Sequence, residues 1–499
     1  MSDQTYLIIA LCLYFAAMIA IGIYAYRRTT DHEGYMLAGR RLPSWAAALS
    51  AGASDMSGWL MMGLPGAIYA AGLIEGWIAV GLTLGAYLNW RLVAPRLRSY
   101  TEVAQNSITI PSFFENRLHD GSRLLRVASG VILLIFFTFY VSSMLVAGGE
   151  FFVLAFNTSY LTGMLIVAGV TLAYTLIGGF LGASLTDVVQ GAMMLFALLV
   201  VPVIALVSLG GPGEAVNIVQ DVDPSRLSLF GGEALTMATT IGVISALAWG
   251  LGYFGQPHVI VRFMALRSPS EATAARRIGI SWMALSLLGA AACGLIGIAY
   301  FDETAHELGN PEHVVLALSQ ILLHPLVVGL VFAAVAASIM STVSSQLIVS
   351  SSAFVEDLYK LAGRRSSERS LLMLGRACVL AVALIAALLA LNPGGTILEL
   401  VAFAWAGFGA SFGPAVLLSL FWRRLSSWGA LAGMVAGAAT VFLWSAYGPE
   451  VFGATLYEII PGFTANVLVA VVVSRLTFRP DAELDHEFTQ AVEGARAKS

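Results

Sequence analysis

The chain has 499 residues, of which 58% are hydrophobic and only 11% charged, and its mean hydropathy is +0.83. Soluble proteins are about a quarter charged and their single cores stop growing at roughly 250–300 residues, so this composition excludes a soluble enzyme and a disordered hub. A net charge of −4 excludes a nucleic-acid binder, because it leaves no basic surface. Cys12, Cys293 and Cys378 lie in apolar runs and offer neither a disulfide framework nor metal-ligand spacing. The composition is that of an integral membrane protein with many helices.

Thirteen apolar runs are long enough to cross a bilayer, which takes about 20 mostly apolar residues. The spans are expected at 6–26, 44–70, 73–94, 127–149, 160–180, 188–209, 235–254, 278–301, 326–354, 371–391, 397–421, 428–447 and 455–474. The first run is longer than the apolar part of a signal peptide and no cleavage site follows it, so we expect a retained helix.

The distribution of basic residues sets the orientation, because cytoplasmic loops are rich in Lys and Arg. With the N-terminus outside, Arg226 is the one Lys or Arg among 26 that falls outside the expected inner segments, which are 27–43, 91–126, 262–277, 360–376, 423–424 and the tail from 475. The sequence therefore predicts an external N-terminus and a cytoplasmic C-terminus. The acidic segment 481–499 of the short tail is expected to be partly disordered.

Two of the expected spans contain helix-breaking sequences. The second span carries Gly, Ser and Asp55 within 51–59, and the seventh carries three Gly and one Pro within 249–257. Unwound backbone within a membrane must line a cavity or be buried by protein, and breaks five spans apart are typical of an inverted repeat that binds substrate and ions at the breaks. The alternative is that these glycines only allow close helix packing, which is a sufficient explanation for Gly433 and Gly437.

This repeat divides the chain into four parts. They are an N-terminal helix with a cytoplasmic loop (1–42), a ten-helix core (43–426) with repeats 43–210 and 234–426, two C-terminal helices (427–475) and a short cytoplasmic tail (476–499).

Asp55 is the one carboxylate that the sequence places deep within a span. A charge there costs at least roughly 2.5–3.5 kcal/mol, so its default interpretation is functional, and a bound cation would offset the cost. Hard cations prefer oxygen ligands, which backbone carbonyls near Ala53 and Met56 could supply. The ninth span adds hydroxyls at helical spacing: Ser338, Ser341, Thr342, Ser344 and Ser345. The alternative is that these hydroxyls bond only to carbonyls of their own helix.

Other polar residues have less decisive positions. Asp187 begins the expected sixth span, where it could meet the helix dipole or hold an ion. Glu399 is expected at the outer interface. Arg40 and Arg41 are expected to be ordinary cytoplasmic positive charges.

Aromatic residues suggest where a small solute binds. Trp249 and Tyr253 are four residues apart around the second break, and Tyr140 lies within the fourth span. Their rings could enclose an apolar ring, although Trp and Tyr also mark membrane interfaces.

Several stretches together make the sequence recognisable: 35–40, 50–59, 177–180 with 186–187, 249–258, 340–342 and 457–463. The chain resembles the solute:sodium symporter family through nearly its whole length. The resemblance implies an all-α LeuT-type fold with one helix before the ten-helix core and two after it. It also implies import of L-proline across a bacterial cytoplasmic (inner) membrane by alternating access, driven by Na+.

The resemblance also assigns roles to particular residues. It implies a sodium site formed by Ala53, Met56, Ser338, Ser341 and Thr342, with Asp55 governing sodium affinity. It implies a coupling and substrate region at Ser57, Gly58 and Trp59, and a proline pocket at Tyr140, Trp249, Tyr253 and Pro257. A second sodium, as in some relatives, would use Asp187 with Ser341, Ser344 and Ser345.

Three other interpretations remain open. The first is a symporter of the same family for another solute, such as pantothenate, a sugar or a short organic acid. The second is a transporter-like sensor, against which the short segment after Arg475 argues. The third is coupling to protons instead of sodium. No nucleophile elbow, phosphate-binding loop or metal-ligand cluster indicates an enzyme. The expected partners are L-proline, Na+ and the lipid bilayer, and the sequence allows a monomer.

Overall fold

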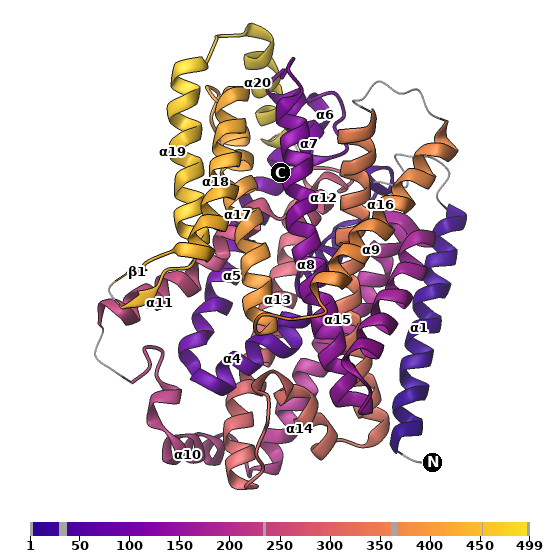
Figure 1. Cartoon of the computed structure of the whole chain (residues 1–499), viewed down its shortest axis with the longest axis vertical. Helices are drawn as coiled ribbons and strands as arrows, with labels where there is room; N and C mark the ends of the chain where they lie inside the picture. The colour runs from indigo at the N-terminus through magenta and orange to yellow at the C-terminus, as the bar shows by residue number, and fades with distance from the viewer. Residues whose placement is uncertain (1–2, 29–36, 233–235, 361–366, 452, 497–499) are drawn as a thin grey trace.

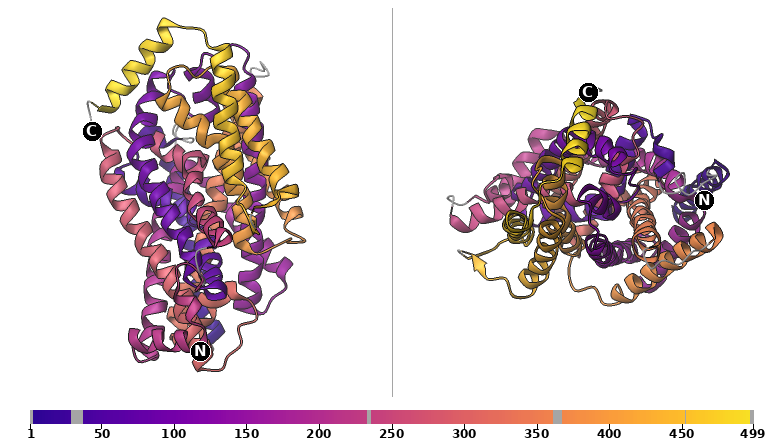
Figure 2. Two further views of the ribbon diagram at one scale, coloured as in Figure 1. Left: turned by 90° about the vertical axis from the view of Figure 1, so that its left-hand side faces the viewer. Right: turned by 90° about the horizontal axis from the view of Figure 1, so that it is seen from above.

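The protein is a bundle of helices that run mainly along one long axis (Figures 1 and 2). The computed structural model describes residues 3–28, 37–232, 236–360, 367–451 and 453–496. Eleven helices in these ranges are long and apolar enough to cross a membrane, so the chain is a multi-pass membrane protein. Tyr35 and Met36 of the first motif, in the expected loop after the first span, lie outside the described residues.

The elements of the first half begin with a helix that packs on the outside of the bundle. They are α1 (Asp3–Arg28), η1 (Ala38–Arg40), α3 (Ser44–Asp55), η2 (Trp59–Gly63), α4 (Leu64–Ala71), η3 (Leu73–Glu75), α5 (Gly76–Leu88), η4 (Asn89–Val93), α6 (Ala94–Val103), α7 (Ile110–Arg117), α8 (Leu124–Phe156), α9 (Tyr160–Ser208), α10 (Pro212–Val222) and η5 (Pro224–Leu227).

The second half is also helical except for one short antiparallel hairpin, in which β1 pairs with β2. Its elements are α11 (Met237–Ala248), η6 (Trp249–Gly255), α12 (Pro257–Met264), α13 (Glu271–Glu303), η7 (Pro311–His313), α14 (Val314–Leu322), α15 (Pro325–Ser352), η8 (Ala353–Tyr359), α16 (Glu368–Leu389), α17 (Ile397–Phe421), α18 (Ser427–Tyr447), β1 (Glu450–Val451), β2 (Ala454–Thr455), α19 (Ile459–Thr477) and α20 (Ala482–Arg496).

The structure contains both predicted breaks. Helix α3 ends at Asp55, Met56 has a non-helical ψ of 86°, and a π-helical turn, η2, then leads into α4. In the second repeat, η6 is a 3-10 helix, Gln256 is extended with ψ 105°, and α12 starts at Pro257. In both places the regular hydrogen bonding of the α-helix is interrupted inside the bundle, which leaves backbone carbonyls without their helical partners.

Two predicted spans are divided more finely than the sequence indicates. The ranges 44–70 and 73–94 are helical, but each is split into segments too short to count among the eleven long apolar helices. The total of thirteen spans therefore stays a prediction.

The predicted start of the sixth span was wrong. Helix α9 bends at Gly179, whose φ of 59° and ψ of −163° are open to glycine, and this bend separates 160–177 from 179–208. Asp187 therefore lies well inside the second segment and not at its N-terminus, so the helix dipole does not explain it.

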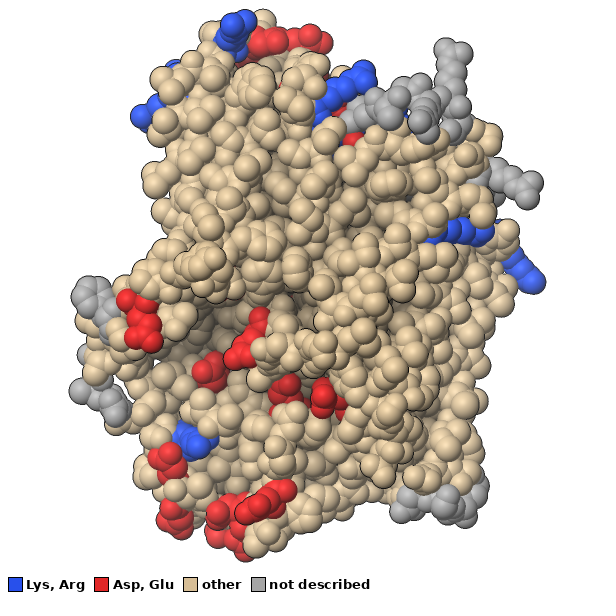
Figure 3. All heavy atoms as spheres, in the orientation of Figure 1, with Lys and Arg blue, Asp and Glu red and all other residues tan. Residues whose placement is uncertain are grey.

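Charge is divided between the two ends of the molecule. On the face in Figure 3, most Lys and Arg lie in the upper half, while Asp and Glu gather in the lower half, several around a hollow. The lower end holds the start of α1 and the upper end holds α20 (Figures 1 and 2). Arg226, in η5 beside α4, pairs with Asp223 at 3.4 Å and donates to the carbonyls of Tyr69, at 2.9 Å, and Ala70.

The tail is more ordered than the sequence predicts. Within the expected disordered segment, α20 packs against α6, and Phe488, Ala491 and Ala495 are buried. Arg423 pairs with Asp485 at 2.6 Å and also lies 4.9 Å from the centre of the Phe488 ring. The expectation of a partly disordered tail was wrong for residues 482–496, because its few apolar residues share one face of a helix.

Candidate functional site

The break in α3 meets the hydroxyl-rich face of α15. Ser341 Oγ donates to the Ala53 carbonyl oxygen at 2.8 Å, which joins two segments 288 residues apart in the sequence. Gly58 packs closely against α15 at the same junction, because a Cβ on it would lie only 3.3 Å from Ile339 Cγ1. The structure therefore brings together Ala53 and Ser341, two of the residues predicted to hold sodium.

The other hydroxyls of α15 behave partly as the alternative interpretation expects. Ser338 donates to the Val335 carbonyl at 2.8 Å, Thr342 to the Ser338 carbonyl at 3.2 Å, and Ser344 to the Ser341 carbonyl at 3.0 Å. Such bonds leave the lone pairs of each hydroxyl oxygen available to a cation. All three residues are fully buried, so a cation here would be shielded from lipid.

Asp55 is held by the second break. Tyr253 of η6 donates its phenol hydrogen to Asp55 Oδ2, and Trp59 Nε1 donates to the Asp55 carbonyl at 3.0 Å. Asp55 Oδ1 and the hydroxyls of Ser57 and Tyr140 are buried without a hydrogen-bond partner among the described residues. Buried polar atoms are nearly always paired, so these three mark a place where a ligand could bind.

An aromatic cluster surrounds the second break. The Trp249 ring centre lies 6.4 Å from Trp59, 6.4 Å from Trp405 and 5.4 Å from Tyr457. Trp405 also donates to the Trp249 carbonyl at 2.8 Å. Tyr253 joins the cluster, because its ring centre lies 5.1 Å from that of Trp405. Of these five residues, Trp59, Trp249 and Tyr253 were predicted for the coupling region or the pocket. Sequence reasoning missed Trp405 and Tyr457, because each lies in a separate apolar run without a break beside it.

Asp187 carries an ion pair that the sequence did not predict. Arg262 Nη2 lies 3.0 Å from Asp187 Oδ2, and Ser50 donates to the same oxygen at 2.7 Å. Arg262 also donates to Ser345 Oγ at 2.7 Å. The sequence places Arg262 at the start of an expected cytoplasmic segment, 262–277. In the structure its side chain is fully buried on α12, the helix that follows the second break.

Arg40 is also not an ordinary surface charge. It is 7% exposed, and its guanidinium donates to Thr101 Oγ1 at 3.0 Å and to the carbonyls of Met264 at 3.0 Å and Ser107 at 2.6 Å. It thereby ties η1 to the ends of α6 and α12. Glu399, in contrast, is exposed in the first turn of α17, where it forms a capping box with Thr396.

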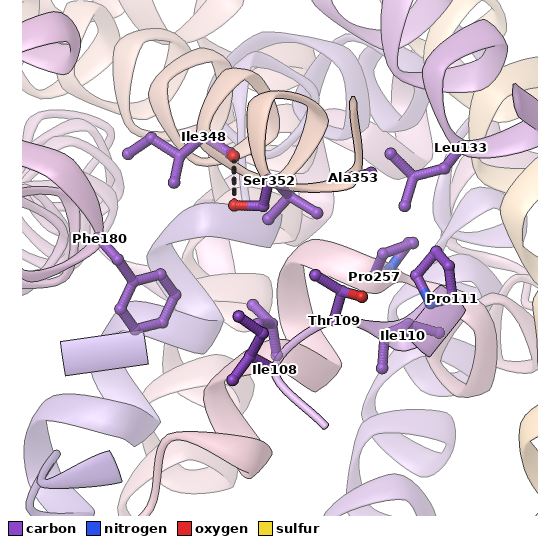
Figure 4. Close-up of a pocket in the computed structure, with 12 residues that line it drawn as sticks. Ile108, Thr109, Ile110, Pro111, Leu133, Phe180, Pro257, Ile348, Ser352 and Ala353 are labelled. Atoms are coloured by element: carbon purple, nitrogen blue, oxygen red, sulfur yellow. Dashed lines mark hydrogen bonds between the residues drawn. The ribbon is translucent and has the colours of Figure 1, made fainter. Parts of the chain in front are cut away.

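Pro257 lines a small cavity whose walls contain none of the residues of the aromatic cluster. Figure 4 shows it beside Thr109, Ile110 and Pro111, opposite residues of α15 and η8. In the wall that α15 forms, Ser352 donates to the Ile348 carbonyl of the preceding helical turn at 2.9 Å. Trp249 is not among the residues that line this cavity, and the assignment of Pro257 and Trp249 to one proline pocket stays a prediction.

A third buried carboxylate lies at the far end of α15. Asp357, in η8, pairs with Arg126 at 2.7 Å and accepts a hydrogen bond from Thr109 Oγ1 at 2.9 Å. Asp357 lies near the end of the candidate span 325–359, whereas Asp187 lies well inside 179–208, so it is Asp187 that corrects the expectation that Asp55 is the one carboxylate deep within a span. Sequence reasoning missed Asp357 because we placed the end of the ninth span at 354.

Comparison with known proteins agrees with this geometry. Residues 35–437 match the family model described as the sodium:solute symporter family. The chain belongs to the sodium:solute symporter family. Membership makes the protein a transporter rather than an enzyme, with Na+ as its coupling ion.

Curated relatives are similar over almost their full lengths. The chain is 53% identical to the high-affinity proline transporter PutP of Bacillus subtilis over 472 residues, covering 94% of this chain and 98% of that protein. It is 50% identical to the osmoregulated proline transporter OpuE of the same species, covering 95% of each. It is 48% identical to a sodium/proline symporter of Staphylococcus aureus, covering 99% of this chain and 97% of that protein.

Solved structures support the fold alone. A Na+-coupled sialic acid symporter in a substrate-bound outward-open state superposes with a TM-score of 0.80 at 19% identity, covering 95% of this chain and 98% of that one. The nucleobase-cation-symport-1 family transporter Mhp1, in a closed conformation, gives 0.54 at 14% identity, covering 91% and 98%. Both are sodium or cation symporters with the LeuT fold, as the sequence resemblance implied.

Proposed function

We propose that this protein imports L-proline into a bacterial cell together with Na+, by alternating access across the cytoplasmic membrane. The relatives that are 48–53% identical are named as proline transporters or sodium/proline symporters. The observation that carries the mechanism is the 2.8 Å contact between Ser341 and the Ala53 carbonyl, because it puts the broken helix against the hydroxyl-rich one.

Sodium binds where these helices meet, with oxygens from Ala53, Met56, Ser338, Ser341 and Thr342. In this mechanism, binding orders the break in α3 and raises the affinity for proline. Linkage requires that proline raise sodium affinity by the same factor. Asp55 connects the two ligands, because its carboxylate accepts from Tyr253, a residue of the proposed proline pocket.

Proline occupies the space between the two breaks, near Ser57, Gly58, Trp59 and Tyr140 on one side and Trp249 and Tyr253 on the other. The aromatic faces of Trp249 and Tyr253 suit the apolar pyrrolidine ring. A carboxylate is favoured at the N-terminal end of a half-helix. Pro257, which starts α12 directly after the second break, completes the proposed pocket.

The proposed topology has thirteen spans with a five-plus-five inverted repeat, an external N-terminus and a cytoplasmic C-terminus. The two breaks, at α3–α4 and η6–α12, are its support. The end that holds α20, α6 and α7 would then be cytoplasmic, as its exposed Lys and Arg favour. A monomer would suffice, because both breaks belong to one chain.

A second sodium at Asp187 is a weaker proposal. Its support is that Arg262 bridges Ser345 and Asp187 through one nitrogen, Nη2; Ser341 and Ser344, on the same helix, would complete the site. In this arrangement the guanidinium already neutralises Asp187, so a second ion would have to share the carboxylate with Arg262 or displace it.

Uptake of labelled L-proline into proteoliposomes tests the function directly. We expect accumulation with an inward sodium gradient and little without one. A proton gradient in place of sodium should not support uptake. Unlabelled pantothenate, sugars and short organic acids should not compete. Accumulation driven by protons, or competition by one of those solutes stronger than that by proline, would refute the proposal.

A further inference from the structure

A buried charge cluster lies beside the small cavity that Pro257 lines. Arg126, in the first turn of α8, contacts Asp357 at 2.7 Å through Nε and Glu115 at 2.8 Å through Nη1. The Asp357 side chain is fully buried, and those of Arg126 and Glu115 are 17% and 14% exposed. One guanidinium thus joins α8 to both η8 and α7.

Thr109 connects this cluster to the wall of the cavity. It is the N-cap of α7, where its side chain accepts from the Ser112 backbone amide, and its hydroxyl also donates to Asp357 Oδ1 at 2.9 Å. Thr109 faces the cavity in Figure 4, and so do Ser352 and Ala353 at the start of the π-helical segment η8 that carries Asp357. The cavity and the cluster therefore share one wall.

We propose that Arg126, Asp357, Glu115 and Thr109 form a latch that closes the path from the substrate site to the cytoplasm. The inference rests on the proposed function and its orientation, and it names residues outside the proposed sodium and proline sites. The cavity lies between α12, just after the second break, and the segment 108–111. To open it toward the end that holds α7, segment 108–111 must move away from η8, which breaks the Thr109–Asp357 bond.

The energetics favour a latch over a fixed brace. A buried ion pair gives little net stability while it is intact, but removing one partner leaves an uncompensated charge. The intact cluster therefore adds little to the stability of the closed state. A variant that lacks one partner leaves a buried, uncompensated charge, which destabilises the closed state and favours the open one, where water solvates that charge. The π-helical turn η8 supports a mobile role, because such turns mark functional irregularities in helices.

Accessibility of a cysteine in the cavity tests the latch. Ser352→Cys would be introduced into a chain in which Cys12, Cys293 and Cys378 are replaced by alanine. A membrane-impermeant maleimide would then be added to the cytoplasmic face of inside-out vesicles, without proline or sodium. In this background, we expect Asp357→Asn and Arg126→Gln each to raise the labelling rate about tenfold. The double variant should fall short of the product of the two effects, because both break one pair.

Two milder variants and one control keep the test decisive. Thr109→Val and Glu115→Gln remove single contacts and should raise labelling less, even if the stronger variants fail to fold. Asp485→Asn removes an ion pair at the same end of the molecule, with side chains 49% and 59% exposed, and should change nothing. Unchanged labelling in every folded latch variant would overturn the proposal, as would labelling of the parent from the outer face alone.

The readout does not depend on the identity of the solute. If proline uptake fails while the latch variants still become accessible, the proposed substrate is wrong and the latch stands. If uptake succeeds while accessibility stays constant, the latch is wrong and the transport function stands.

Discussion

Two carboxylates near the centre of the bundle are held by different partners. Asp55 accepts a hydrogen bond from the Tyr253 phenol, and its other carboxylate oxygen has no partner within the described part of the chain, whereas Asp187 forms an ion pair with Arg262. An anion without a cation beside it is costly within a membrane, so Asp55 is the better candidate to recruit one. Asp55 could be found from the sequence because it interrupts an apolar run. Arg262 could not, because nothing in a single sequence shows that the helix after the second break is buried.

Asp55→Asn tests the role of the charge at this position. Asparagine has nearly the same shape and can still accept from Tyr253, so the fold should persist. We expect the sodium concentration for half-maximal proline uptake to rise roughly tenfold or more, equivalent to about 1.4 kcal/mol. Glu303→Gln, at the exposed end of α13, is the matched acid-to-amide control and should leave it unchanged. Normal sodium activation in Asp55→Asn would contradict the proposed role.

Ser341→Ala distinguishes ion ligation from bonding within a helix. The Ser341 hydroxyl lies within hydrogen-bonding distance of two carbonyls, that of Ala53 across the junction at 2.8 Å and that of Ser338 in its own helix at 3.0 Å. The Ser344 hydroxyl donates to the Ser341 carbonyl of its own helix at 3.0 Å. We expect Ser341→Ala to weaken sodium activation several-fold and Ser344→Ala to have little effect. Sodium titration of uptake measures both. A loss in Ser344→Ala as large as that in Ser341→Ala would favour the second sodium site.

At the level of elements, glycines set how closely the broken helices approach their neighbours. A Cβ on Gly252, in η6, would lie 1.9 Å from Trp405 Nε1, and one on Gly255 would lie 2.3 Å from the Phe408 carbonyl oxygen. The 3-10 segment can therefore rest against α17 only because these positions lack side chains. The sequence predicted where the helices break, because Gly and Pro cluster there. It could not predict that η6 would be a 3-10 helix or that α17 would supply the facing indole.

Gly252→Ala should disrupt this contact. Overpacking a closely fitted site costs about 1–3 kcal/mol, and here the facing group is a rigid ring that also bonds to the Trp249 carbonyl. We expect a lower unfolding temperature in detergent and loss of proline uptake. Gly242→Ala on α11 is the control, since its Cβ would meet nothing within 4 Å, and alanine there should be neutral or stabilising. Equal behaviour of the two variants would show that the close approach does not matter.

Glu312, in η7, gives the contact between η7 and the start of α17 a dependence on pH. Its carboxylate accepts from the Ile397 and Leu398 amides at 3.1 and 3.3 Å, and burial raises its pKa above the usual 4.5. A folded-state pKa that is raised means that stability is lost as pH rises through the window between the unfolded value and the higher folded one. We therefore expect the unfolding temperature of the parent, relative to Glu312→Gln, to increase as pH falls through that window. Thermal unfolding of both proteins across this range measures it, and a constant difference would contradict the shift.

On the scale of the whole molecule, the polar C-terminal helix α20 packs against one end of the apolar helix bundle. The buried face of α20 packs on α6, and Phe488 lies near the guanidinium groups of Arg117 and Arg423. Composition and the distribution of Lys and Arg were enough to predict a multi-pass helical protein. They did not predict α20, because a charged fifteen-residue segment folds only where a partner surface receives its apolar face.

Phe488→Ala should release this helix. Loss of a buried aromatic ring costs about 3–5 kcal/mol in a core. We expect this loss to exceed the free energy that docks so short a helix on the bundle. We expect fast hydrogen exchange across 482–496 in the variant and slow exchange in the parent, measured by mass spectrometry. Gln490→Ala, on the exposed side of the same helix, should retain the protection. Equal exchange in all three proteins would mean that the docked arrangement is not the populated one.

The isolated position of Arg226 has a practical consequence. Trypsin cleaves after Lys and Arg. On the proposed topology, Arg226 is the one described Lys or Arg between the spans that trypsin added outside an intact cell could reach. Its guanidinium is partly shielded, at 30% exposure, by Asp223 and the last carbonyls of α4. Brief digestion of whole cells would therefore cut the chain into two pieces of predictable mass, and Arg226→Gln would protect it, giving a direct assay of which side faces the medium.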